Sequence, residues 1–101
     1  MEYFQSDMIY WPQKIAIEAF PYDCRDKTNG PIWYKEAFHA HRSADQSTIY
    51  GDPEDDQRIM IWSGETIHSA GPGDWIIRGV GGRIYSVSDH EFKYLYEKEN
   101  T

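Results

Sequence analysis

Apolar residues recur in short segments along this chain, and most of these segments lie in its second half. Segments of this length, bounded by glycine or by polar turns, are typical of β-strands. The sequence predicts strands at KIAIEAF (14–20), QSTIY (46–50), RIMIW (58–62), TIHSA (66–70), DWIIRG (74–79) and RIYSV (83–87). Because short turns join the last four, we expect an antiparallel meander of about four strands, which the strand at 14–20 joins.

The segment PIWYKEAFHAHR (31–42) has the pattern of a helix. Pro31 suits the first helical position, and Trp33, Ala37 and His41 follow at helical spacing on one face. We therefore expect a helix of two to three turns here.

A second helix is predicted near the end of the chain. Glu91 stands three residues after Ser88, which is the spacing of a capping box. The helix that it opens runs through FKYLYE (92–97), and we expect Phe92 and either Leu95 or Tyr96 to face the sheet.

These elements predict one α+β domain that spans residues 1–101. Its architecture is a small antiparallel β-sheet of about five strands with two short helices packed on one face. A length of 101 residues suits one core and not two. Residues 1–12, which are rich in aromatic side chains, have no place in this scheme and are expected to form an N-terminal arm.

The aromatic content of the chain predicts exposed aromatic side chains. Four Trp, eight Tyr and four Phe make up 16% of the residues. A core of this size has no room for all of them, so we expect some to line a surface groove or an interface. An aromatic core with half-exposed tyrosines is the alternative.

The charge and the cysteine content narrow the classes of partner. The formal net charge of −7 argues against direct nucleic-acid binding, because phosphate contacts need a basic surface. An acidic surface either attracts a basic protein partner or serves only solubility. The single cysteine, Cys24, excludes an internal disulfide and a zinc site built on cysteines. The lack of a signal-like start and of a long apolar run predicts a cytoplasmic protein with no membrane partner.

The segment SAGPGDWIIRGVGGRIYSV (69–87) is the first candidate for a binding site. Its turn contains Gly73, and Arg78 and Arg83 flank the hairpin that follows. Backbone N–H groups and two guanidinium groups could therefore hold a phosphate. The structural alternative is that Pro72 and Gly73 only shape a turn before a strand.

The segment HAHR (39–42) is the second candidate. Its histidines stand at i and i+2, which do not share a helix face, so no metal site is expected, and no cofactor is predicted. His41 and Arg42 are instead candidates to contact a phosphate or a base. No serine stands at the sharp strand-to-helix turn of a nucleophile, and no phosphate-binding loop occurs, so we expect no catalytic residues and no enzyme activity.

Aromatic side chains complete the predicted site. Trp33, Tyr34 and Trp75 are candidates to stack on a nucleobase beside an arginine that holds the phosphate. Trp62 belongs to the same group of candidates. Core packing is the alternative for Trp33 and Trp75.

The order of these motifs resembles that of a group of small, mostly uncharacterised phage and prophage proteins. The matching segments are QKIAIEAF (13–20), PIWYKEAF (31–38), IWSGET (61–66), PGDWIIRGVGGRIYSV (72–87) and FKYLYE (92–97). Where the group has a GEFYPC step, this chain has GRIYSV. The resemblance implies a phage origin and no established enzyme chemistry. Small phage proteins of this kind are often inhibitors of bacterial immunity, which is an association rather than a physical argument.

Three hypotheses of function follow. The first is a phage counter-defence protein in the cytoplasm of the infected bacterium, which sequesters a nucleotide-type immune signal, a cyclic nucleotide or an ADP-ribose derivative, without catalysis. Because small domains build such pockets between protomers, it would be a homo-oligomer. The second is an acidic inhibitor that binds a host defence protein directly, with acidic patches at residues 52–56 and near residues 97–99 that steer it to a basic, nucleic-acid-binding surface. The third is a phage accessory or structural protein.

Overall fold

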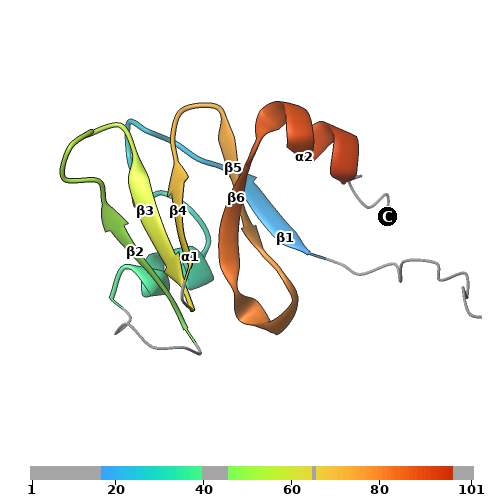
Figure 1. The fold of residues 1–101 in the computed structure, drawn as a ribbon, viewed down its shortest axis with the longest axis horizontal. Coiled ribbons are helices and arrows are strands. Elements are labelled where there is room, and N and C mark those ends of the chain that lie inside the picture. Colours follow the sequence, from blue (N-terminus) through green and yellow to red (C-terminus); the bar gives the residue numbers. More distant parts are fainter. Residues whose placement is uncertain (1–16, 40–45, 65, 97–101) are drawn as a thin grey trace, which may run out of the picture.

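The structure is a computed structural model that describes residues 17–39, 46–64 and 66–96 (Figure 1). These residues form strands and helices together, so the predicted α+β class is confirmed, and the five later strands begin and end within one residue of their predicted bounds. In chain order the elements are β1 (Glu18–Pro21), α1 (Ile32–Ala37), β2 (Ser47–Gly51), β3 (Ile59–Ser63), β4 (Thr66–Ala70), β5 (Asp74–Arg78), the 3-10 turn η1 (Val80–Gly82), β6 (Ile84–Ser88) and α2 (Asp89–Leu95).

The strands form two antiparallel sheets of three, in the orders β1-β5-β6 and β2-β3-β4 (Figure 1). The prediction of one sheet of about five strands is wrong, because the turn between β4 and β5 carries the chain from one sheet to the other. In that turn Gly73 has a φ of 88°. The N–H of Gly71 donates to Asp74 Oδ2 (2.9 Å), and the N–H of Asp74 donates to the carbonyl of Gly71 (3.0 Å). These bonds close a corner, so β4 pairs only with β3 and β5 pairs with β1 and β6.

The core lies between the inner faces of the two sheets. Alternation along β3 buries Ile59, Ile61 and Ser63 and leaves Met60 and Trp62 on the outer face, as the two-residue period of a strand requires. The core is mostly isoleucine, with aromatic residues from the loop after β1 and from α1. Its buried members are Tyr22, Tyr34, Ala37, Ile49, Ile59, Ile61, Ala70, Ile76 and Ile84.

The two helices pack on different surfaces, so the expectation that both cover one face is also wrong. Tyr34 and Ala37 of α1 belong to the core between the sheets. Helix α2 packs instead on the outer face of β5, where Phe92 stacks on Trp75 with ring centroids 3.9 Å apart. The reason is the alternation along β5: Ile76 points into the core, and Trp75 therefore points away from it.

Ser88 caps α2, as predicted, and its hydroxyl lies 3.3 Å from Glu91 Oε1. Ser88 is the N-cap, and its hydroxyl accepts a hydrogen bond from the N–H of Glu91 (3.1 Å). Of the two residues expected beside Phe92, it is Tyr96 that contacts the Phe92 ring, at a centroid distance of 5.4 Å. Leu95 is exposed.

A ring of hydrogen bonds joins the start of β6 to the inner face of the other sheet. The N–H of Ile84 donates to Ser47 Oγ (2.9 Å), and Ser63 Oγ donates to the carbonyl of Ile84 (2.7 Å). The two serine oxygens lie 2.6 Å apart. Because the single proton of Ser63 goes to the carbonyl, Ser47 must donate to Ser63. Both serines are buried, and the ring therefore satisfies every polar group in it.

Within the described part of the chain, neither helix has the length and apolar character that crossing a membrane requires. The helices span only six and seven residues.

We predict that Asp89 titrates at an unusually low pH. Trp75 Nε1–H donates to Asp89 Oδ1 (2.9 Å) and Lys93 Nζ lies 3.1 Å from Oδ2, and these contacts, that of Trp75 first, lower the pKa of Asp89. The contacts of ionised Asp89 make their full contribution to the free energy of unfolding at pH values above the pKa of an unfolded aspartate, about 3.9. This contribution is lost as the pH falls through the lower pKa of Asp89 in the folded state.

The indole N–H signal of Trp75 in a nitrogen-15 NMR titration measures this directly. It should move with a midpoint below about 3.9, and Asp89→Asn should abolish that movement. A midpoint at or above 3.9 in the folded protein would contradict the assigned hydrogen bond.

Candidate ligand-binding groove

The candidate site is an open groove of about 250 Å³ between β4 and β6. These two strands lie side by side but belong to different sheets, and no backbone ladder joins them (Figure 1). The groove is lined by Ser63, Thr66, His68, Arg83, Ile84, Tyr85 and Ser86.

Side-chain hydrogen bonds take the place of a ladder along the groove. At the start of β6, Ser63 Oγ bonds to the carbonyl of Ile84 within the ring described above. Farther along, Ser86 Oγ donates to the carbonyl of Ser69 on β4 (3.1 Å). Between these two links the strands stay apart, which leaves the space that Thr66 and His68 line from the side of β4.

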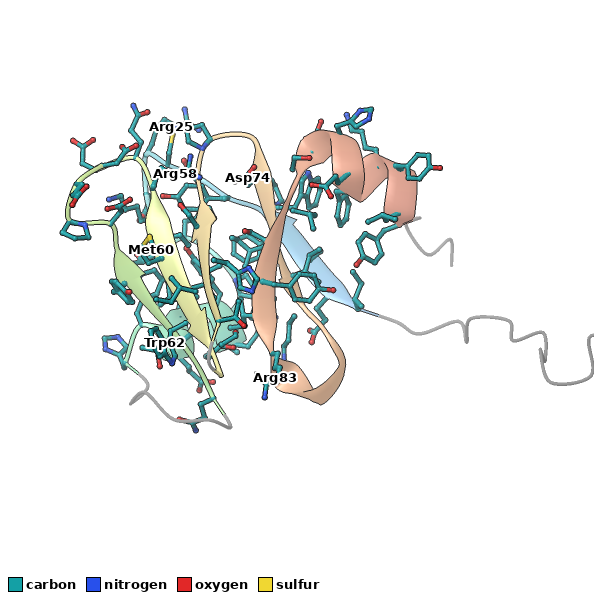
Figure 2. The ribbon with its side chains drawn as sticks, viewed as in Figure 1. Arg25, Arg58, Met60, Trp62, Asp74 and Arg83 are labelled. Atoms are coloured by element: carbon teal, nitrogen blue, oxygen red, sulfur yellow. The ribbon has the colours of Figure 1, made fainter. Side chains whose placement is uncertain are left out.

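Arg83 brings a permanent positive charge to the groove (Figure 2). Its guanidinium lies over Gly64 in the turn between β3 and β4: a Cβ atom added to Gly64 would stand 2.5 Å from Arg83 Nη1. Gly64 also has a φ of 62°, a conformation that favours glycine. The glycine therefore allows both the turn and the close approach of the arginine.

The other polar groups of the groove are uncharged donors or an imidazole. Thr66 carries a hydroxyl group and His68 carries a ring N–H, whereas the hydroxyl protons of Ser63 and Ser86 already go to the carbonyls of Ile84 and Ser69. Burial, and then a hydrogen bond with Tyr96 (3.1 Å between the hydroxyl oxygens), raise the pKa of Tyr85 to about 12, so this phenol is neutral at physiological pH. No carboxylate occurs among the described residues that line the groove. The set suits an anion that accepts several hydrogen bonds.

The structure brings three of the predicted site residues together at another place. Arg78 lies over Trp33, with its Cζ 6.0 Å from a ring centroid, and the Trp33 and Tyr34 rings meet edge to face. Arg78 also pairs with Glu18 (3.3 Å), whose carboxylate offsets its charge, and both side chains are substantially exposed. Tyr34 has no exposed surface and donates its hydroxyl proton to the carbonyl of Lys27. Burial raises the pKa of Tyr34. An anion would therefore compete with Glu18 at this pair.

Two other predicted site residues, Trp75 and Gly73, make contacts with helix α2. Trp75 stacks on Phe92 with one face and donates its N–H to Asp89. Gly73 is exposed in the corner between the sheets, and its carbonyl accepts the N–H of Asp89 (3.0 Å). Since Asp74 already accepts the N–H of Gly71, a carboxylate occupies the place where a phosphate would have met this turn.

His41 and Arg42 lie outside the described residues. Arg78 and Arg83, which were expected to flank one site, contact different elements: Arg78 meets β1 and α1, and Arg83 meets the turn between β3 and β4. Among the described residues, no group of three or more His, Cys, Asp and Glu side chains is placed to hold a metal ion.

The sequence analysis identified Arg83 as a site residue but none of the other groove residues. Thr66, His68, Tyr85 and Ser86 lie in segments that it predicted as strands. Alternation places the side chains of His68 and Ile61 on one face of their sheet. Alternation does not predict that β6 lies opposite that face, because the position of β6 depends on the corner between β4 and β5.

Comparison of the chain with protein-family models, with curated proteins and with solved structures gave no match.

We predict that Gly64→Ala disturbs Arg83, whereas Gly82→Ala does not. Both glycines have positive φ, so each substitution should cost about 1–2 kcal/mol of folding free energy through backbone strain. Only at Gly64 does the new methyl group meet another side chain, since nothing lies within 4 Å of a Cβ at Gly82.

Chemical denaturation of a double-mutant cycle checks this prediction. In the Arg83→Ala background the cost of Gly64→Ala should fall, while the cost of Gly82→Ala should stay the same. If Gly64→Ala lowers the free energy of unfolding equally in both backgrounds, the contact between Gly64 and the Arg83 guanidinium is wrong.

Proposed function

We propose that this protein binds and sequesters a phosphate-bearing nucleotide signal without catalysis, as a phage counter-defence protein in the cytoplasm of the infected bacterium. The observation that carries the proposal is the convergence of Arg83, directly before β6, and His68, on β4 of the other sheet, on a groove that also contains the hydroxyl of Thr66. The phage and counter-defence context comes from the motif resemblance described in the sequence analysis.

Local charge makes anion binding compatible with the acidic chain. A net charge of −7 repels anions at long range, but ionic strength screens exposed charges beyond about 10 Å. Within the groove the described lining residues include one guanidinium and one imidazole and no carboxylate. A phosphate there would receive charge-assisted hydrogen bonds, which are stronger than neutral ones.

The size of the groove limits what it encloses. Sites that bury most of a drug-sized ligand measure about 300–1,000 Å³, and this groove, at about 250 Å³, is smaller and open. It accommodates the phosphate and part of a sugar, and leaves the base outside it. A second protomer that covers the base would complete the site, so the proposed binding form is a homo-oligomer.

We predict that a ligand of this class raises the melting temperature of the protein. The test is a thermal-shift panel of cyclic dinucleotides, cyclic trinucleotides, ADP-ribose isomers and inorganic phosphate. At ten times its Kd a ligand adds about 1.4 kcal/mol to the free energy of unfolding, which corresponds to roughly 5 °C or more for a domain of this size. Arg83→Ala should weaken the binding of a responding ligand about tenfold to a hundredfold.

Arg25→Ala is the matched control for Arg83→Ala. It removes the same charge from a side chain that is 90% exposed and pairs with Asp23, outside the groove. Its affinity for the ligand should stay within about twofold of the parent protein, because exposed charges contribute little. A panel without any shift, or a shift that survives Arg83→Ala, would contradict the proposed site. Sedimentation of the complex tests the oligomer separately.

A further inference from the structure

The outer face of β2-β3-β4 is an apolar surface that is independent of the groove. The strand register aligns its side chains in two rows across the sheet, Thr48–Trp62–Ile67 and Tyr50–Met60–Ser69. Figure 2 shows Met60 and Trp62 along the central strand β3, with Arg58 at its start.

This face exposes large apolar side chains from both of its flanking strands. Tyr50 on β2 is 38% exposed and Ile67 on β4 is 46% exposed, and Met60 and Trp62 lie between them, each half-buried. Single exposed apolar residues are ordinary on a protein surface, but a contiguous group on one sheet face marks an interaction site.

An acidic loop borders one end of this face. The loop joins β2 to β3 directly after Tyr50 and Gly51. Its first turn is closed by Asp52, which accepts the N–H of Glu54 (2.9 Å). Its second turn is closed by Asp55, which accepts the N–H of Gln57 (3.0 Å). Glu54 and Asp56 remain as exposed carboxylates beside the apolar face.

Arg58, at the start of β3, is turned toward β4. Arg58 Nε donates to Ser69 Oγ (2.8 Å), and its guanidinium packs over Gly71, where an added Cβ would stand 2.3 Å from Nη1. It therefore lies on the side of the face away from β2. Lys27 Nζ reaches the end of β2, where a Cβ added to Gly51 would stand 3.7 Å from it, but the four carboxylates of the loop outnumber these two cations.

The dimensions of the face suit a single helix. Three strands about 4.8 Å apart and five residues of about 3.4 Å each give a surface roughly 10 Å wide between the flanking strands and 17 Å long. A helix is about 10–12 Å across, and three turns of it are about 16 Å long. A second copy of this chain would bring a second acidic loop and a further −7 of net charge to the interface, which disfavours self-association through this face.

We propose that the outer face of β2-β3-β4 docks a basic amphipathic helix of another protein. The apolar side of the helix lies on Tyr50, Met60 and Ile67, and lysine or arginine at its end meets Glu54 and Asp56. This surface lies outside the groove and does not depend on the proposed ligand.

The test uses a 14-residue peptide of Leu and Lys at helical spacing, with a scrambled peptide of the same composition as its control. Nitrogen-15 NMR titration at low salt should shift the amide signals of β2, β3 and β4 for the helical peptide. The scrambled peptide, which carries the same charge without an apolar face, should bind at least tenfold more weakly.

Two matched variants separate apolar contact from charge. Ile67→Ser should weaken binding at least fivefold, while Leu95→Ser, at a similarly exposed position on α2, should leave the affinity within twofold. Glu54→Gln with Asp56→Asn should weaken binding about threefold at low salt, while Glu36→Gln on α1 should have no effect. The loss caused by the acidic pair should vanish at high salt.

Four results would overturn the proposal. The first is that the helical peptide does not bind at all, and the second is that the helical and scrambled peptides bind equally. The third is equal loss of binding from Ile67→Ser and Leu95→Ser. The fourth is concentration-dependent shifts on this face in the protein alone, which would show that a second copy occupies it.

Discussion

Three hydrogen bonds among Ile84, Ser47 and Ser63 hold the two sheets in their relative position. The backbone groups of Ile84 at the open edge of β6 would otherwise lie buried without partners, which costs about 1–3 kcal/mol for each group. The two serines satisfy both groups from the inner face of the other sheet. Their hydroxyls replace the strand that would have paired there. The ring therefore allows β6 to approach β2-β3-β4 without joining it.

The groove is a consequence of this arrangement. Side-chain hydrogen bonds hold β6 beside β4, first at Ile84 and again where Ser86 bonds to Ser69. No backbone ladder joins the two strands, so a groove remains between them. The same approach brings Arg83, the residue before Ile84, over Gly64 of the neighbouring turn. The positive charge of the proposed site is thus placed by the contact that joins the sheets.

Local features of the sequence were sufficient to predict the elements, but not how the two sheets are joined. The bounds of the five later strands, the N-cap at Ser88 and the class of the fold follow from alternation and turn residues, which act between near neighbours. The first strand is shorter than predicted, since it begins at Glu18 rather than at residue 14 and residue 17 lies outside it. The division into two sheets depends on whether β5, after the corner at Gly71, pairs with β4 or with β1. The sequence pattern of a meander is compatible with both. The pairing of Ser47 with Ser63 and the approach of both to Ile84 link residues 16 to 37 positions apart, for which the sequence has no local signal.

The candidate site shows the same limit. Arg83 was predicted from its place beside a glycine-rich turn, but His68 required knowledge of the neighbouring sheet. Trp75 was expected at a base and stacks on Phe92 instead, since the helix that covers it is fixed by the alternation along β5. Trp33 and Arg78 are in contact, as the predicted site required, but Arg78 also forms an ion pair with Glu18.

The exchange rate of the Ile84 amide hydrogen tests the central claim most directly. If the ring joins the sheets, this amide exchanges only when the domain unfolds, as slowly as the amides of the central strand β3. An Ile84 amide that exchanges as fast as that of exposed Gly82 would show that the start of β6 is an open edge, and the account of the groove would then be wrong.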